Sequence, residues 1–274
     1  MKPAAFDYAR PASAAEATPL LAEAEARPLS GGMSLGPMLN LRLARPSRLI
    51  DITRLPGLTE ASETPTHIRL GAAITHASIE DGETPEPLPG LLRHIAGGIA
   101  YRAVRTRGTI GGSLAHADPA ADWLTAMTLL DAEIETLQGR RIPIRGFTRG
   151  AYATALPAGD IITAIHIPRA SASARWGWHK ICRKSGEFAQ AIGAALIDPE
   201  RGTARLIAGA TGGAPLPLDA LAADLARTAT PPSPDALRSA LTEALTAANL
   251  PAEPVKLKLL TTALNRAIRD LLAP

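Results

Sequence analysis

The sequence predicts an α+β protein, and three observations lead to that fold class. A strand, a glycine-rich loop, a helix and a second strand fit residues 27–52, and a hairpin pattern fits residues 132–144. Three strand-like segments followed by two long helices fit residues 176–272. The chain has 274 residues, of which 46% are hydrophobic and 20% are charged, so it is long enough to bury a sizeable core.

The N-terminal part opens with a helix. Ser13 and Glu16 have the spacing of a capping box, and the alanine-rich run behind them predicts a helix that continues to about Ala26 and is stopped by Pro28. A strand, a glycine segment, a brief helix and a second strand follow at residues 27–30, 31–36, 37–43 and 49–52. Because the brief helix begins next to the glycine segment, its free N–H groups and dipole favour an anion there.

The middle part alternates strands and helices around a second glycine segment. Asp118 as an N-cap and Pro119 at the first helical position predict a helix that carries Asp122 in its first turns, facing back toward the glycines. Gln138-Gly139-Arg140 is typical of a hairpin turn. The remaining predicted elements are strands at 68–74, 132–137, 141–144 and 161–167 and a helix at 88–95.

The C-terminal part begins where the composition changes. Proline and small residues gather up to Ala174, which indicates a domain boundary near residue 170. The sequence thus predicts a first domain at residues 1–170, with lobes at about 1–55 and 56–170, and a second domain at 171–274. The predicted elements of the second domain are strands at 176–183, 189–197 and 204–209, a proline-rich loop at 228–234 and helices at 235–249 and 255–272.

Composition excludes several classes of protein. The net charge is +3 with basic residues dispersed along the chain, and 3% of residues are aromatic, so nucleic acid is not an expected partner. Cys182 is the single cysteine, which excludes a disulfide framework and a thiolate metal centre built from this chain alone. We therefore expect no metal site. No stretch approaches the ~20 apolar residues that a bilayer requires, so we expect no membrane span. The N-terminal residues lack a charged region followed by an apolar run, so we expect no leader and hence a cytoplasmic protein.

Two glycine pairs flanked by hydroxyl residues are the most informative motif of the chain. The first lies within residues 29–36 and the second within residues 109–113. Glycine lets backbone N–H groups converge on phosphate oxygens, so two such segments predict one large nucleotide held at both ends. A single glycine pair is also typical of a tight turn or a bulge.

The type of nucleotide follows from what the two segments lack. A loop for phosphoryl transfer requires a lysine, and a Rossmann fingerprint requires Gly-x-Gly-x-x-Gly; neither segment has these residues. The pattern therefore favours a dinucleotide whose pyrophosphate is bound by neutral backbone donors and hydroxyls. FAD suits such a site better than ATP.

Three segments carry a family resemblance. The first is residues 27–35 together with Leu-Ile-Asp-Ile at 49–52. The second is Gly-Thr-Ile-Gly-Gly-Ser-Leu-Ala-His-Ala-Asp-Pro-Ala-Ala-Asp at 108–122, and the third is Arg-Lys-Ser-Gly-Glu-Phe-Ala at 183–189. Together they resemble the FAD-binding medium subunit of the molybdenum hydroxylases, the group of carbon monoxide dehydrogenase and xanthine dehydrogenase. The resemblance extends to about residue 213 and reaches the C-terminal helices in pattern only. It implies a two-lobed FAD-binding domain of the PCMH-like type and a small C-terminal domain with a three-stranded antiparallel sheet and helices.

The resemblance also implies which residues contact FAD. The first glycine segment would wrap the diphosphate, the second would contact the diphosphate and ribityl region, and Asp122 would accept hydrogen bonds from the cofactor. Ile99 and Ile162 would make apolar contacts, while Lys184 and Phe188 would lie near the flavin ring. The implied set is Leu29, Ser30, Gly31, Gly32, Met33, Ser34, Leu35, Gly36, Ile99, Thr109, Ile110, Gly111, Gly112, Ser113, Asp122, Ile162, Lys184 and Phe188.

Three positions depart from the family pattern. Met33 stands where Gln or His is common and Ser113 where Asn is common, so a side-chain hydrogen bond is lost or shortened at each segment while the backbone donors remain. Phe188 stands where Tyr is common, so a hydroxyl-dependent role is absent there. A buried core phenylalanine in a strand is the alternative interpretation of Phe188.

The resemblance implies an electron-transfer subunit. A flavin moves electrons, yet the sequence has neither a second redox centre nor an acid–base pair, so no catalytic residue is expected and substrate oxidation is assigned to a partner. The implied complex combines this FAD subunit with a large molybdenum-cofactor subunit and a small subunit that holds 2Fe-2S clusters, as a dimer of heterotrimers. The abundance of Ala, Arg and Pro indicates a bacterial gene. Two alternatives stay open: a free-standing flavin-dependent oxidoreductase, and a non-redox nucleotide-binding or assembly protein.

Three arginines precede the second glycine segment. Arg102, Arg105 and Arg107 could meet a phosphate or a partner's carboxylates, but we expect a solvated basic face. The histidines lack metal-ligand spacing and a neighbouring nucleophile, so we expect them to be structural or at the surface.

Overall fold

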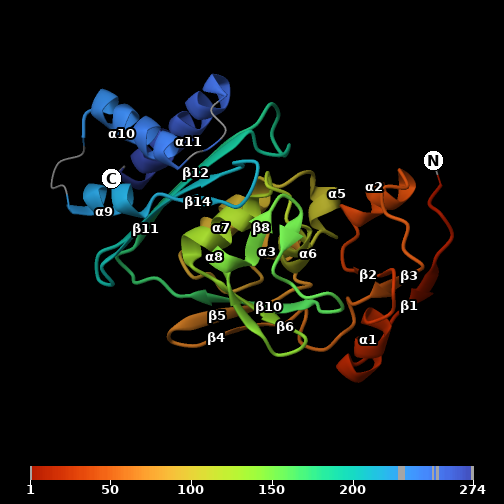
Figure 1. The fold of residues 1–274 in the computed structure, drawn as a ribbon. Coiled ribbons are helices and arrows are strands. Elements are labelled where there is room, and N and C mark those ends of the chain that lie inside the picture. Colours follow the sequence, from red (N-terminus) through yellow and green to blue (C-terminus); the bar gives the residue numbers. More distant parts are fainter. Residues whose placement is uncertain (1, 228–231, 249, 251–252, 273–274) are drawn as a thin grey trace.

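Three β-sheets of three or more strands, each with its covering helices, follow one another along the molecule. The computed structural model describes residues 2–227, 232–248, 250 and 253–272. The sheet formed by the N-terminal strands lies at one end of the molecule, the C-terminal helices lie at the other, and a five-stranded sheet occupies the part between them (Figure 1). None of the helices within the described residues is long and apolar enough to cross a membrane.

The N-terminal sheet is parallel and has the strand order β1-β3-β2. Ser13 caps the first helix by accepting a hydrogen bond from the N–H of Glu16 at 3.2 Å, which confirms the predicted start. The helix ends at Leu21 rather than near Ala26, because the chain turns at Glu25 (φ 59°) and then pairs with the neighbouring strand. The elements are β1 (Asp7–Ala9), α1 (Ala14–Leu21), β2 (Ala26–Leu29), α2 (Leu35–Asn40) and β3 (Arg48–Asp51).

The middle sheet has five strands in the order β4-β5-β10-β6-β7, and each neighbouring pair is antiparallel. The predicted hairpin is confirmed: Ile134 lies opposite Ile142, and Gly139 adopts φ +75° in the turn. The strands of this sheet are β4 (Ala61–Glu63), β5 (His67–Gly71), β6 (Glu133–Thr136), β7 (Arg141–Pro143) and β10 (Ile162–Pro168).

Six short helices and a small hairpin accompany the middle sheet. The second glycine pair was expected in a loop, but it forms the first turn of α6, for which Thr109 is the N-cap. The helix expected from Pro119 begins only at Asp122, because the Asp118 carboxylate accepts the N–H of Ala120 at 2.9 Å and closes a separate turn. The elements are α3 (His76–Glu80), α4 (Leu91–Gly97), α5 (Arg102–Arg105), α6 (Ile110–His116), α7 (Asp122–Leu130), α8 (Ile144–Phe147), β8 (Thr148–Gly150) and β9 (Ala153–Thr154).

The C-terminal sheet contains the expected antiparallel meander of three strands, and a two-residue strand extends it by a fourth. A further helix, α9, was not expected. The predicted helix end at Asn249 and most of the proline-rich loop, residues 228–231, lie outside the described residues. The elements are β11 (Arg175–Ile181), β12 (Ala191–Asp198), β13 (Thr203–Gly209), β14 (Leu216–Pro217), α9 (Asp219–Arg227), α10 (Pro234–Ala247) and α11 (Pro254–Leu272).

Both faces of the C-terminal sheet are covered. Ile192 and Ile207 point into the core that the middle helices share, whereas Ala191 and Leu206 point into the core beneath α11. A Cβ atom on Gly193 would lie 2.3 Å from the Ala263 carbonyl carbon, so this glycine allows the sheet and α11 to approach closely. The hydrophobic core thus continues across residue 170, and the division of the chain into two domains there stays a prediction.

Candidate functional site

The two glycine segments, far apart in sequence, lie against each other. The hydroxyl oxygens of Ser30 and Thr109 are 2.9 Å apart. A Cβ atom on Gly31 would lie only 1.9 Å from the Arg107 carbonyl oxygen, so glycine is required for this approach. We call residues 30–36 together with residues 109–113 the glycine cradle.

The first half of the cradle presents free backbone donors. Strand β2 ends at Leu29, Gly32 adopts φ +70°, and the N–H of Gly36 donates to the Gly32 carbonyl at 2.8 Å. Within the described part of the chain, the N–H groups of residues 32–35 have no intrachain acceptor. Four consecutive N–H donors beside two hydroxyl groups form an arrangement that suits phosphate oxygens.

The second half of the cradle uses its backbone N–H groups internally, contrary to the expectation that both segments would offer them. The N–H of Ile110 donates to the Ile74 carbonyl at 3.1 Å, and that of Gly111 donates to the Ala72 carbonyl at 2.9 Å. The N–H of Gly112 donates to the Thr109 hydroxyl at 3.1 Å, and that of Ser113 donates to the Thr109 carbonyl at 3.0 Å. A Cβ atom on Gly111 would lie 2.4 Å from the Ala72 Cβ atom. This half therefore contributes hydroxyl groups and close backbone packing.

A buried histidine binds the backbone just before the second half of the cradle. The N–H of His76 donates to the Gly108 carbonyl at 2.9 Å, and the indole N–H of Trp123 donates to His76 Nδ1 at 3.1 Å. Burial, together with the nearby Arg105 charge, lowers the pKa of His76 to about 4. The ring is therefore neutral at physiological pH and accepts from Trp123.

We expect the folded protein to lose stability as the pH falls below 6.5, because the unfolded chain protonates His76 with an ordinary pKa near 6.5 and the folded chain does so only near pH 4. The contribution is complete above about pH 6.5 and falls by about 2–3 kcal/mol toward pH 4. Urea unfolding of the wild type and of His76→Gln across this pH range measures it. A variant whose stability falls as steeply as that of the wild type would contradict the assignment to His76.

Asp122 lies in the first turn of α7 as predicted, and it is 5% exposed. Its Oδ2 accepts a hydrogen bond from Lys180 Nζ at 2.8 Å, and Lys180 also donates to the Gly98 carbonyl at 3.1 Å. The other oxygen, Oδ1, has no hydrogen-bond partner among the residues that the structure describes. Burial raises the pKa of Asp122, and the Lys180 charge opposes that rise. A buried carboxylate oxygen without a donor is costly, which makes Oδ1 a candidate acceptor for a ligand group.

Sequence reasoning missed Lys180. In strand β11, Trp176, Trp178 and Lys180 alternate and therefore share one face. Both tryptophans pack on the core. A lysine on the same face as two core tryptophans predicts a buried acidic partner, and this pattern was the available signal.

The remaining predicted residues divide between the surface and the core. Ile99 is half-buried in the turn formed by residues 98–100, and the N–H of Ala100 donates to the Gly186 carbonyl at 2.9 Å, so the loop at residues 183–188 lies on this turn. Phe188 is 63% exposed, so the core interpretation is wrong, and Lys184 in the same loop is also exposed. Ile162 is 3% exposed within the core, and its contact with a cofactor stays a prediction.

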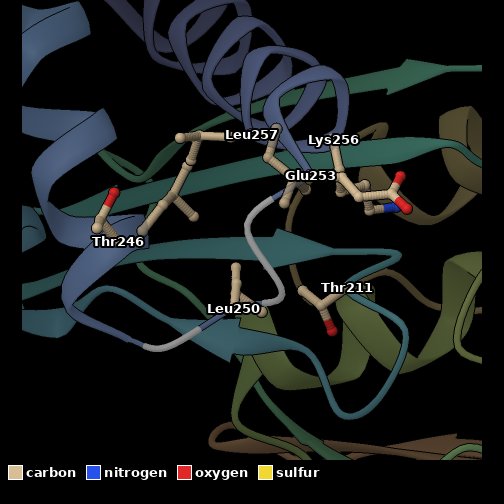
Figure 2. A pocket seen from close by; sticks show the side chains of 8 residues that line it. Thr211, Thr246, Leu250, Glu253, Lys256 and Leu257 are labelled. Carbon is tan, nitrogen blue, oxygen red and sulfur yellow. The ribbon is translucent and has the colours of Figure 1, made fainter.

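A separate pocket of about 240 Å³ lies in the C-terminal part of the chain. Figure 2 shows Leu250 and Leu257 on its wall, with Lys256 in the first turn of α11 and Glu253 just before that helix. None of the cradle residues lines this pocket. The convergence of donors and hydroxyls is in the cradle, and we place the candidate site there.

The fold and the backbone donors of the cradle point to the class of dinucleotide-binding proteins. Residues 4–170 match the family described as the FAD binding domain in molybdopterin dehydrogenase. The carbon monoxide dehydrogenase medium chain of Afipia carboxidovorans is 38% identical over 203 residues, which are 72% of this chain and 70% of the relative. The 6-hydroxypseudooxynicotine dehydrogenase complex subunit alpha of Paenarthrobacter nicotinovorans is 35% identical over 202 residues, which are 72% of this chain and 68% of the relative.

Solved structures of related proteins have the same fold over nearly the whole length of this chain. The carbon monoxide dehydrogenase from Hydrogenophaga pseudoflava that lacks the Mo-pyranopterin moiety matches with a TM-score of 0.88 and 31% identity, covering 99% of each chain. The quinoline 2-oxidoreductase from Pseudomonas putida 86 matches with a TM-score of 0.87 and 29% identity, covering 99% of this chain and 98% of that one. The chain belongs to the FAD-binding medium subunits of the molybdenum hydroxylase family, and it is an FAD-dependent oxidoreductase subunit.

Proposed function

We propose that this chain is the electron-output subunit of a molybdenum hydroxylase, in which FAD receives electrons from iron–sulfur clusters of a partner and passes them to an external acceptor. The observation that carries the proposal is the glycine cradle, whose N–H groups at residues 32–35 have no acceptor among the described residues, in a chain of this family. The buried Oδ1 atom of Asp122, which has no partner among the described residues, supports it.

The residues present fit FAD. The N–H groups of residues 32–35 would hold the diphosphate, together with the one hydroxyl hydrogen that the Ser30–Thr109 hydrogen bond leaves free. All of these are neutral donors around one point of close backbone approach. Asp122 would accept a hydrogen bond from a donor group of the cofactor through Oδ1. The other predicted contacts are Leu29, Gly36, Ile99, Ile110, Gly111, Gly112, Ser113, Ile162, Lys184 and Phe188.

Bound FAD supplies one- and two-electron transfer to such a site. This chain's own residues bind and orient the cofactor; we assign no general acid or base to them. Phe188 has no hydroxyl group, so at that position the chain contributes an exposed apolar ring and no proton donor. Selectivity for the oxidised substrate would then belong to another subunit.

The names of three relatives support an assembly of several subunits. One is named a medium chain, another a medium subunit and another a subunit of a dehydrogenase complex. We propose a large subunit with a molybdenum cofactor and a small subunit with 2Fe-2S clusters, assembled as a dimer of heterotrimers in the cytoplasm.

Co-purification tests this function. We expect the chain, expressed with the genes that flank its own, to elute as one complex that contains iron, molybdenum and about one FAD per chain, measured by absorbance, acid release of the flavin and metal analysis. A chain that carries FAD, elutes alone and is reduced directly by a substrate would favour a free-standing oxidoreductase. A colourless chain that takes up no added FAD would contradict the proposal.

A further inference from the structure

Arg105 joins an acidic side chain to two backbone carbonyl groups. Its Nε and Nη2 atoms donate to the two carboxylate oxygens of Glu80 at 2.7 and 2.9 Å. Its Nη1 atom donates to the carbonyl oxygens of Ile99 and Ala100, both at 2.9 Å. The guanidinium is largely buried, with 12% of the side chain exposed, so the expected solvated basic face does not exist at this residue.

The carbonyls that Arg105 binds belong to a turn in an unfavourable conformation. Ala100 adopts φ 45°, in the left-handed region that side chains other than glycine rarely occupy. Lys180 holds the preceding carbonyl, that of Gly98, at 3.1 Å. Three consecutive carbonyl groups are thus bound by two cations, and such a turn persists only when its surroundings impose it.

The loop at residues 183–188 rests on this turn. Ala100 donates its N–H to the Gly186 carbonyl at 2.9 Å. Gly186 adopts φ +85°, and a Cβ atom there would lie 2.6 Å from the Ala100 carbonyl oxygen. The loop therefore takes its position from the backbone of Ala100, and it carries the exposed side chains of Lys184 and Phe188.

We propose that Arg105, oriented by Glu80, is a positioning residue for the flavin site: by holding the turn at residues 98–100, it fixes the loop at residues 183–188 against the bound cofactor. The inference rests on the proposed function, because that function places this loop beside the flavin. Arg105 itself would touch no reacting atom.

Arg102 offers a matched control on the same helix. It pairs with Glu80 at 2.7 Å and with Asp81, so its replacement also removes ion pairs beside the site. Its hydrogen bonds go to these carboxylates rather than to the carbonyls of the turn. Both substitutions therefore remove ion pairs with Glu80, but only Arg105→Gln removes the hydrogen bonds to the carbonyls of Ile99 and Ala100.

The test combines hydrogen exchange of the FAD-free full chain with FAD binding. In Arg105→Gln we expect the amide of Ala100 to exchange about tenfold faster, FAD to bind about tenfold more weakly, and the visible spectrum of bound FAD to shift. Arg102→Gln should match the wild type in all three measurements, and Arg105→Lys should recover part of the loss. Wild-type exchange in Arg105→Gln would overturn the inference, and so would faster exchange with unchanged FAD affinity and spectrum. A wild-type chain that binds no FAD would instead overturn the proposed function.

Discussion

Replacement of Lys180 by methionine is expected to lower the free energy of unfolding by about 3 kcal/mol near neutral pH, because it leaves the Asp122 carboxylate buried without its cation. Only 11% of the Lys180 side chain and 6% of the Asp122 side chain are exposed, so water cannot replace the lost charge. Methionine keeps most of the lysine volume, which limits the loss of packing. Urea unfolding of the FAD-free chain measures the change.

The double variant Lys180→Met/Asp122→Leu separates the charge from the packing. Without either charge there is no buried carboxylate to neutralise, so we expect most of the stability to return. The same double variant should bind FAD poorly, because the acceptor oxygen of Asp122 is gone. A double variant as unstable as Lys180→Met would show that the ion pair is not the cause.

The pH gives a second signature of this pair. Burial already raises the pKa of Asp122 while Lys180 opposes the rise, so removal of Lys180 raises that pKa further. A carboxyl group whose pKa is higher in the folded state than in the unfolded state stabilises the folded protein at low pH. This stabilisation is lost as the pH increases through the folded-state pKa. The stability difference between wild type and Lys180→Met should therefore shrink as the pH falls. A difference that is constant with pH would contradict this origin.

Gly31→Ala is expected to abolish most FAD binding. The added Cβ atom would lie 1.9 Å from the Arg107 carbonyl oxygen and 2.9 Å from the Gly108 Cα atom, and both are backbone atoms that cannot rotate away. The first half of the cradle must then move from the second. We expect this movement to remove two of the charge-assisted hydrogen bonds between the cradle and the FAD diphosphate. At about 1.5 kcal/mol each, their loss weakens FAD binding about 100-fold. Titration of the FAD-free chain with FAD, followed by flavin fluorescence, measures the affinity.

Gly146→Ala is the control for this substitution. Gly146 lies in helix α8, and a Cβ atom there would have no heavy atom within 4 Å. We expect FAD affinity to stay at the wild-type value and stability to be unchanged or slightly higher, since alanine favours helix. If Gly31→Ala also bound FAD normally, the contact between the two glycine segments would not be needed for the cofactor.

Much of the fold was predictable because its signals are local. The hairpin at Gln138-Gly139-Arg140 requires only a turn between two apolar runs, and the meander of β11–β13 follows from three strand-like segments. The helix boundaries near Ala26 and Pro119 were wrong, because strand pairing and the Asp118 turn decided them. Those interactions compete with helix formation, and their outcome depends on neighbours that periodicity alone does not identify.

By itself the sequence determined that this is an α+β chain with two glycine segments, that these segments favour a dinucleotide held by neutral donors, and that their motifs resemble one family of FAD-binding subunits. Only the tertiary structure decided which N–H groups remain free, that Ser30 meets Thr109, that Lys180 neutralises Asp122 and that Arg105 binds the turn at residues 98–100. The physical reason is that a motif requires neighbours in sequence, whereas the pairing of a buried charge or donor depends on which distant segments the folded chain brings into contact and shields from water.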